Sequence, residues 1–175
     1  GLLKRGILES YEKEVGRLQV SVCRLQEPNP LSPAQEKAYG EIHEAFKTKE
    51  VCLLHGVTSS GKTEIYVRLI HEVLRLGRQV LYMLPEIAIT TQITERLAKL
   101  FGDKLLVYHS KFSDNERVEV WNKLLHNDEP MLVLGVRSSL FLPFKDLGLI
   151  IVDEEHENTY KQQDPAPRYH ARNAA

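Results

Sequence analysis

The segment Gly56-Val57-Thr58-Ser59-Ser60-Gly61-Lys62-Thr63 decides the fold, because it matches the pattern GxxxxGK[ST] at each fixed position. Residues 51–55, directly before it, form a short and mostly apolar run that predicts a buried strand. Residues 62–76 start at the end of the loop and have helical spacing. They are followed by Gly77, a residue type that often ends helices. A strand, a glycine-containing loop and a helix in this order predict a phosphate-binding loop.

The residue types of this loop suit the phosphates of a nucleotide such as ATP. Backbone amides that point into the loop form a cradle for anions, and the N-terminus of the following helix adds about +0.5 elementary charge. Lys62 is predicted to reach the β- and γ-phosphates, and the hydroxyl of Thr63 is predicted to bind Mg²⁺. The predicted nucleotide-binding residues are Gly56, Val57, Thr58, Ser59, Ser60, Gly61, Lys62, Thr63 and Glu64.

A second apolar strand pattern, at residues 147–152, carries two acids at its C-terminal end. Ligands of open α/β sheets bind beyond the carboxyl ends of the strands. Asp153 is therefore predicted to hold Mg²⁺, and Glu154 to orient or deprotonate the attacking water. Glu155 and His156 extend the pair to a DEEH box. Lys62, Asp153 and Glu154 are the candidate catalytic residues. For the acidic pair, the alternative is a plain solvated loop.

Strand and helix patterns alternate along the rest of the chain. Ser32 and Pro33 form a helix start, with a capping residue followed by proline at the first helical position. Further strands are predicted at residues 79–84, 105–109 and 131–135, and further helices at residues 34–46, 89–101 and 114–126. This alternation predicts βαβ units, and hence a three-layer α/β domain with a mainly parallel sheet.

The composition is that of an ordinary globular domain, with 175 residues, 42% hydrophobic and 27% charged. The net charge of −1 lacks the large basic footprint of a duplex-DNA-binding domain. Apolar runs fall short of the roughly 20 residues of a membrane span, and we find no signal-peptide pattern. Cys23 and Cys52 form no CxxC pair. We expect a cytoplasmic protein without membrane contact.

The first part of the chain differs from the rest. It is charged and only weakly periodic, and it is followed by the linker-like sequence Glu27-Pro28-Asn29-Pro30. Residues 1–27 are predicted to be the end of a preceding domain or a linker. Residues 28–175 are predicted to be the nucleotide-binding domain.

The motifs and their order resemble superfamily 2 helicases and, more narrowly, the PriA family, the primosomal protein N′ of bacterial replication restart. The resemblance extends over about residues 31–175. It is carried by the loop and its continuation Glu64-Ile65-Tyr66, by Leu84-Pro85-Glu86-Ile87-Ala88-Ile89-Thr90-Thr91-Gln92, by Gly135-Val136-Arg137-Ser138-Ser139-Leu140-Phe141-Leu142-Pro143-Phe144, and by residues 153–170.

The resemblance implies a RecA-like P-loop NTPase fold, the first lobe of an ATP-dependent 3′-to-5′ DNA helicase that acts in replication restart and primosome assembly in the bacterial cytoplasm. Its implied cofactors are ATP and Mg²⁺. Its implied partners are forked or single-stranded DNA, with primosome and single-strand-binding proteins for the whole protein. We expect the chain to be truncated after the DEEH box, so that a second lobe with an arginine finger and a zinc site lie elsewhere, and we expect the isolated chain to be nearly inactive.

The resemblance also assigns individual residues. Gln35 matches the glutamine that reads adenine, and its amide offers both a donor and an acceptor. Thr90 and Gln92 match a segment that holds single-stranded DNA, and Arg137 and Ser138 match a later segment with the same kind of role. Hydroxyls and amides at these positions suit sequence-independent contacts with phosphate.

Two other functions fit the same motifs. One is a DExH-type DNA translocase that moves without unwinding, which strand-displacement assays on forked DNA would distinguish. The other is a non-catalytic nucleotide-binding docking module, for which Lys62→Ala and Glu154→Gln would leave the biological activity intact. The complete loop together with Asp153 and Glu154 argues against the docking module.

Overall fold

The computed structural model describes residues 25–57, 60–85, 88, 91–109, 112–164 and 166–175. Most of the predicted linker therefore lies outside the described residues. So do Thr58 and Ser59 of the loop and Thr90 of the predicted DNA-binding segment.

The centre of the described chain is a four-stranded sheet in the order β2-β3-β1-β4. Its strands are β1 (Gln79–Met83), β2 (Leu105–Tyr108), β3 (Leu132–Gly135) and β4 (Leu147–Val152). All three pairings are parallel, which confirms the predicted parallel sheet. Met83 is in register with both Gly135 and Val152, so the carboxyl ends of three strands meet at one edge.

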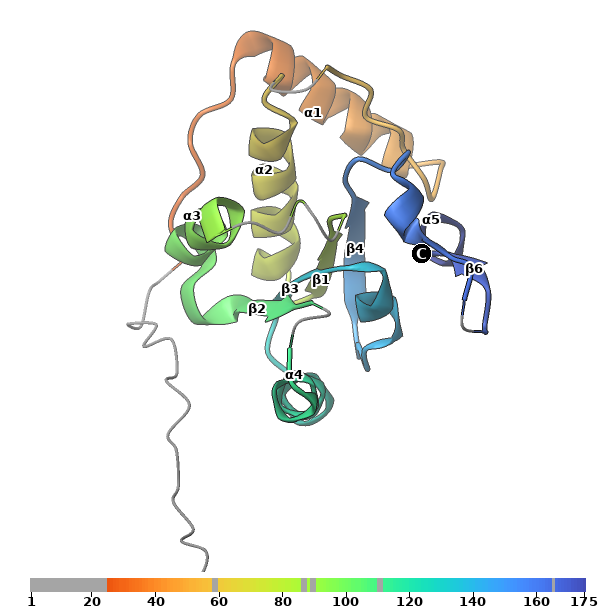
Figure 1. Ribbon diagram of the computed structural model, residues 1–175. Helices are drawn as coiled ribbons and strands as arrows, with labels where there is room; N and C mark the ends of the chain where they lie inside the picture. Colours follow the sequence, from red (N-terminus) through yellow and green to blue (C-terminus); the bar gives the residue numbers. More distant parts are fainter. Residues whose placement is uncertain (1–24, 58–59, 86–87, 89–90, 110–111, 165) are drawn as a thin grey trace, which may run out of the picture.

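Helices cover both faces of the sheet and make the predicted three layers (Figure 1). On one face, α2 (Lys62–Arg75) and α3 (Thr91–Phe101) pack against Val80 and Tyr82 of β1. On the other, α4 (Asp114–His126) packs against Leu81 and Met83 of the same strand. Every residue of β1 is buried, as expected for a central strand covered on both sides.

The first helix, α1 (Pro33–Phe46), begins as the sequence predicts. The side chain of Ser32 accepts a hydrogen bond from the backbone of Gln35, whose own side chain accepts one from the backbone of Ser32, which is a complete capping box. The helix packs on α2 through Ile42, which shares a small apolar cluster with residues of that helix.

The predicted buried strand at residues 51–55 is wrong. These residues have no regular secondary structure, and the exposed fractions of Val51 and Leu53 are 83% and 72%. Their neighbours Cys52 and Leu54 pack against the α1–α2 cluster instead. The segment and β4 line the same pocket, but among the described residues no strand pairing joins them. Apolar content alone could not reveal this, because a strand also needs a hydrogen-bonded neighbour.

The end of the chain folds back beside the carboxyl edge of the sheet. A 3₁₀ turn at Asn158–Tyr160 leads into a short antiparallel pair, β5 (Lys161–Gln162) and β6 (Tyr169–His170), and then into α5 (Ala171–Ala174). Two more 3₁₀ turns, at Gly102–Lys104 and Arg137–Phe141, follow α3 and β3. Within the described ranges, the helices are too short or too polar to cross a bilayer.

Part of the predicted linker contacts the domain. The backbone amide of Gln26 donates to the carbonyl of Leu100 at 3.1 Å, and Leu25 packs against the core on the α2–α3 face. Glu27 lies 3.7 Å from Arg75 at the end of α2. Residues 25–27 therefore pack against the domain that is predicted to begin at residue 28.

Candidate active site

The loop meets α2 at Gly61, whose backbone is left-handed with φ of 81°. A Cβ atom here would lie 2.4 Å from Nε2 of Gln35, a side-chain end that can move, so it is the left-handed backbone that favours glycine. No side chain of the described residues caps the N-terminus of α2. The amide of Glu64 donates to the carbonyl of Gly61 at 3.1 Å, and helix N-termini without a side-chain cap can offer their first amides to an anion.

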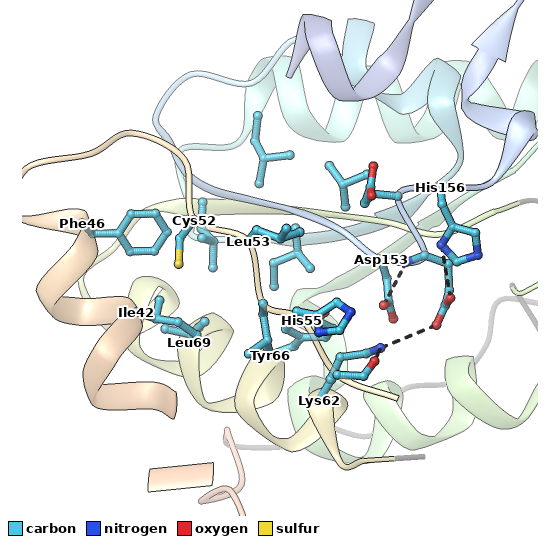
Figure 2. Close-up of a pocket in the computed structure, with 18 of the residues that line it drawn as sticks. Ile42, Phe46, Cys52, Leu53, His55, Lys62, Tyr66, Leu69, Asp153 and His156 are labelled. Atoms are coloured by element: carbon cyan, nitrogen blue, oxygen red, sulfur yellow. Dashed lines mark hydrogen bonds and ion pairs between the residues drawn. The ribbon is translucent and has the colours of Figure 1, made fainter. Parts of the chain in front are cut away.

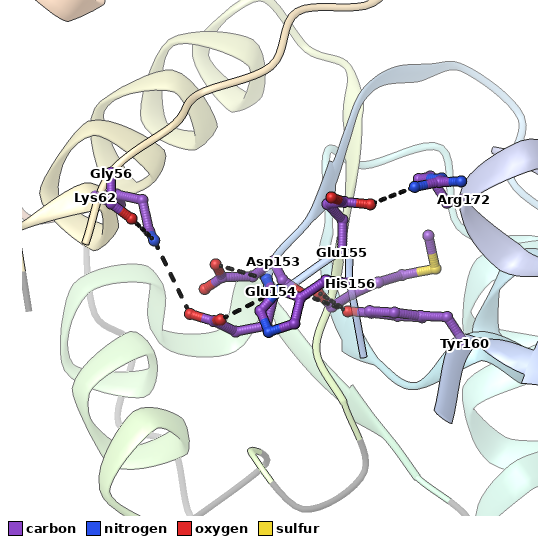
Figure 3. A network of polar contacts seen from close by, with 9 residues as sticks. Gly56, Lys62, Asp153, Glu154, Glu155, His156, Tyr160 and Arg172 are labelled. Atoms are coloured by element: carbon purple, nitrogen blue, oxygen red, sulfur yellow. Dashed lines mark hydrogen bonds and ion pairs between the residues drawn. The ribbon is translucent and has the colours of Figure 1, made fainter. Parts of the chain in front are cut away.

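Lys62 projects from the first turn of α2 toward the DEEH box (Figure 3). Its Nζ donates to the carbonyl of Gly56 at 2.8 Å and lies 3.9 Å from Oε1 of Glu154. Only 19% of the side chain is exposed. A largely buried ammonium thus faces the carboxylate of Glu154 across the space between the loop and the end of β4.

Asp153 follows directly after β4, and its position is fixed by several hydrogen bonds. Its backbone amide donates to the carbonyl of Met83 at 3.0 Å. Its Oδ1 accepts from the amide of Glu154 at 3.0 Å, and its Oδ2 accepts from the hydroxyl of Tyr82 at 3.0 Å. The hydroxyl of Tyr160 lies 2.7 Å from the carbonyl of Asp153 and 3.0 Å from that of Met83. Backbone and carboxylate are both held.

Glu154 turns the chain sharply at the end of β4. Its φ is +49°, a left-handed conformation that residues other than glycine seldom adopt. Its carboxylate is 35% exposed and lies 3.9 Å from both Lys62 Nζ and His156 Nδ1. Strained backbone of this kind is concentrated at functional sites, because the surrounding contacts must hold it in place.

Three tyrosines surround Asp153. Burial raises the pKa of Tyr82, Tyr160 and Tyr66, and the negative charge of Asp153 raises each pKa further. All three hydroxyls therefore keep their protons throughout the ordinary pH range. The rings of Tyr66 and Tyr82 pack edge to face, with centroids 5.7 Å apart.

The residues present fit a magnesium ion. Thr63 and Asp153 offer a hydroxyl and a carboxylate, the oxygen donors that Mg²⁺ prefers. Each carboxylate oxygen of Asp153 accepts one of the hydrogen bonds described, which leaves further lone pairs for a metal. Among the described residues, the ion pairs of the site include those of Glu154 with Lys62 and of Glu155 with Arg172.

A pocket of about 380 Å³ joins these groups to an apolar region (Figure 2). Lys62, Asp153 and His156 line its polar end, while Ile42 and Phe46 of α1 line its apolar end. Its wall also includes residues 52–57, 149–152, Tyr66 and Leu69. The loop and the acids, predicted separately from the sequence, therefore border one space.

Two of the predicted nucleotide-binding residues have other partners. Oε1 of Gln35 accepts from the amide of Ser32 at 2.8 Å, and Nε2 donates to the carbonyl of Gly61 at 3.1 Å. Gln35 thus touches the loop, and its reading of adenine stays a prediction. The carboxylate of Glu64 pairs with Arg96 of α3 and does not line the pocket.

The predicted DNA-binding residues that the structure describes lie near the carboxyl edge of the sheet. Gln92 and Ser138 are exposed, in the segments that follow β1 and β3. Arg137 is turned toward the end of the chain, where its Nη1 donates to the carbonyls of Thr159 at 3.0 Å and Lys161 at 3.1 Å. Its observed partners are therefore protein carbonyls.

Sequence reasoning missed the role of two residues around the acids. Tyr82 reads as an ordinary aromatic residue of a buried strand, and only the register of β1 beside β4 brings its hydroxyl to Asp153. Arg172 of α5 pairs with Glu155 at 2.5 Å, across a return of the chain that carries no strong local pattern. The sequence offers no signal for either contact.

Comparison with known proteins agrees with the motifs. The DEAD/DEAH box helicase family matches residues 32–174. The replication restart protein PriA of Bacillus subtilis (strain 168) is 43% identical over 99% of this chain, and that of Synechocystis is 43% identical over 99%. The PriA of Helicobacter pylori is 46% identical over 82%.

These matches confirm the resemblance to PriA proteins. The chain spans 22%, 21% and 22% of the length of these three relatives, about a fifth of each. Because the family match covers most of the chain, including the loop and the DEEH box, the chain belongs to the DEAD/DEAH box helicase family.

Proposed function

We propose that this chain binds ATP with Mg²⁺ and forms the ATP-hydrolysing lobe of a DNA helicase that acts in replication restart. One observation carries the proposal: Lys62 of the loop and Glu154 at the end of β4 face each other at 3.9 Å, beside Asp153. A phosphate-binding cation and a carboxylate for water activation thus border the same pocket.

The loop side of the site would bind the triphosphate. The ammonium of Lys62 would exchange its bond to the Gly56 carbonyl for bonds to the β- and γ-phosphate oxygens. The uncapped amides of α2 would add donors beneath them. Gln35 would approach adenine from α1 while staying in contact with Gly61. Each of these groups neutralises or orients charge on the nucleotide.

The β4 side would act on the water. The carboxylate of Glu154 would orient the attacking water and accept its proton, while Asp153 and Thr63 would hold Mg²⁺. Bound Mg²⁺ supplies positive charge that stabilises the charge developing on the phosphates. The left-handed turn at Glu154 aims its carboxylate back toward Lys62 rather than along the strand.

The function of the whole protein follows from the resemblance to PriA. It would couple ATP hydrolysis to 3′-to-5′ movement on forked or single-stranded DNA in the bacterial cytoplasm, and work with primosome and single-strand-binding proteins. Gln92 and Ser138, exposed beside the carboxyl edge, would contact the DNA backbone, together with Thr90. A zinc site would lie in the part of the protein beyond this chain.

The test is nucleotide binding by the 175-residue chain. Lys62→Ala is expected to raise the Kd for Mg·ATP at least about tenfold, because a charge-assisted hydrogen bond contributes about 1.5–3 kcal/mol and tenfold corresponds to about 1.4 kcal/mol. Titration of a fluorescent ATP analogue measures this Kd. The matched control is Lys99→Ala, which removes an exposed lysine of α3 and is expected to leave binding unchanged. Equal affinity in both variants would reject the proposed site.

A further inference from the structure

The buried hydroxyl of Tyr82 lies beside the carboxylate that the proposed function assigns to Mg²⁺. Tyr82 is the second-last residue of the central strand β1, and only 1% of it is exposed. Its hydroxyl donates to Oδ2 of Asp153 at 3.0 Å. The carboxylate also has Tyr66 as a side-chain hydrogen-bond partner, and its Oδ1 accepts the backbone amide of Glu154.

The surroundings of Tyr82 hold its hydroxyl in one place. The strand is in register with β4, which pairs Tyr82 with Ile151 and so brings the next residue but one, Asp153, within reach of the ring. The ring packs edge to face against Tyr66 of α2, at an interplanar angle of 67°. A phenol on a fully buried strand has few alternative rotamers, so its hydrogen bond also fixes the rotation of the Asp153 carboxylate.

Metal-binding carboxylates depend on such outer partners. A hydrogen bond to one oxygen orients the carboxylate, so that the remaining lone pairs point to the metal, and removing such a partner typically costs about 10–100-fold in metal affinity or activity. The bond at Tyr82 is charge-assisted and its phenol is buried, which makes it stronger than a bond between neutral groups at the surface.

We propose that Tyr82 is a positioning residue for Asp153: its hydroxyl orients the carboxylate for Mg²⁺ without touching the metal or the nucleotide itself. This inference rests on the proposed function, in which Asp153 holds the ion. It assigns to β1, otherwise a purely structural strand, a part in metal binding. A phenylalanine at this position would preserve the packing and lose the orientation.

The experiment separates metal binding from nucleotide binding in the 175-residue chain. The Kd of a fluorescent ATP analogue is measured twice, in saturating Mg²⁺ and in EDTA. Tyr82→Phe is expected to raise the Kd in Mg²⁺ about tenfold, and to leave the Kd in EDTA unchanged. The matched control is Tyr39→Phe, which removes another tyrosine hydroxyl that donates to a carboxylate, Oε2 of Glu72 at 2.7 Å, between α1 and α2. It is expected to change neither value.

Two further variants decide what each result means. Asp153→Asn alone tests the proposed function, and it is expected to abolish the gain in affinity that Mg²⁺ gives. In the Asp153→Asn background, Tyr82→Phe is expected to have no further effect, because both act through one carboxylate. Suppose that Asp153→Asn removes the gain in affinity that Mg²⁺ gives. If Tyr82→Phe then keeps the full gain, or raises the Kd equally in Mg²⁺ and in EDTA, the role of Tyr82 is rejected and the metal site is retained. If Asp153→Asn has no effect, the proposed metal site itself fails.

Thermal unfolding provides the check on folding. A purely structural hydroxyl would lower the Tm of Tyr82→Phe and leave the ratio of the two Kd values as in the original chain. That result contradicts the inference. A changed ratio in a folded variant supports it.

Discussion

Glu154 has a left-handed backbone, with φ of +49°. Among the residues that the structure describes, it is the one residue other than glycine with a positive φ. For an L-residue this conformation costs about 1–2 kcal/mol, and glycine is free of that cost. The chain keeps a carboxylate at this position all the same. The carboxylate lies within 3.9 Å of Lys62, so the conformation that costs stability is also the one that aims the acid.

The strain predicts an inverted order of stability for two substitutions. Glu154→Gly is expected to be more stable than Glu154→Ala by about 1 kcal/mol, because only glycine fits the left-handed turn without cost. Urea unfolding of both variants measures the difference. The control is Glu95, exposed within α3, where the order is expected to be the ordinary one, with alanine about 1 kcal/mol better than glycine. The same order at both positions would show that Glu154 is unstrained.

At the scale of elements, Arg137 connects the 3₁₀ turn after β3 with the segment after the DEEH box. Its two hydrogen bonds to the carbonyls of Thr159 and Lys161 hold the start of β5 against the sheet edge. The sequence resemblance assigned Arg137 to DNA. In this arrangement, its effect on DNA would pass through the segment it holds.

Arg137→Ala is therefore expected to loosen residues 158–162. Amide hydrogen exchange there should quicken about tenfold or more, since charge-assisted hydrogen bonds contribute about 1.5–3 kcal/mol. Hydrogen exchange followed by mass spectrometry measures it. The control is Arg78→Ala, which removes a guanidinium bonded to Asp146 and to the carbonyl of Leu147 at the start of β4. If residues 158–162 exchange equally fast in both variants, Arg137 does not hold them.

The elements differ in how far local sequence decides them. The helix Asp114–His126 and the strand Leu147–Val152 have the bounds that the sequence predicts, because a capping box and a bounded apolar run specify them locally. Residues 51–55 have an equally strand-like sequence but do not form a strand. A strand forms only where a neighbouring strand is placed to pair with it, and the segment's own sequence does not show this. The β5–β6 pair joins strands of two residues, too short for any pattern.

The same distinction applies to the site. The loop and the DEEH box could be predicted, because helix termini and strand ends give fixed directions to a few residue types. Tyr82 could not, because its contact with Asp153 depends on strand register across the sheet. Gln35 shows a third case: it is predicted to read adenine, and in the structure its side-chain amide contacts the loop and completes the capping box.

At the scale of the whole molecule, one pocket joins an apolar end to a polar end. The cation of its polar end is Lys62, at the N-terminus of α2. Related enzymes obtain a further cation from a second lobe or partner, and that cation increases the rate of hydrolysis about 10³–10⁵-fold. The chain alone is therefore expected to bind Mg·ATP but to hydrolyse it very slowly, with or without single-stranded DNA.

Phosphate release at saturating ATP measures this turnover. The Glu154→Gln variant gives the background rate of phosphate release, because it keeps the size of the side chain and removes the carboxylate that would accept the proton. The expected difference between the two proteins is small. Rapid turnover that DNA stimulates and that Glu154→Gln abolishes would show instead that the chain is catalytically complete.

The order of the strands along the chain also determines when each part of the site is synthesised. The central strand β1 pairs with β3 and β4, both of which come later in the chain, and β4 is the last strand of the sheet to leave the ribosome. The loop around Lys62 is made before any of these strands, and Asp153 and Glu154 only after β4. A growing chain therefore contains the residues of the loop well before it contains the acids, and the non-local strand pairings form later still. Nascent chains that end before β4 would lack the two carboxylates that the proposed mechanism needs for magnesium and for water, so under that mechanism they would bind phosphate without hydrolysing ATP.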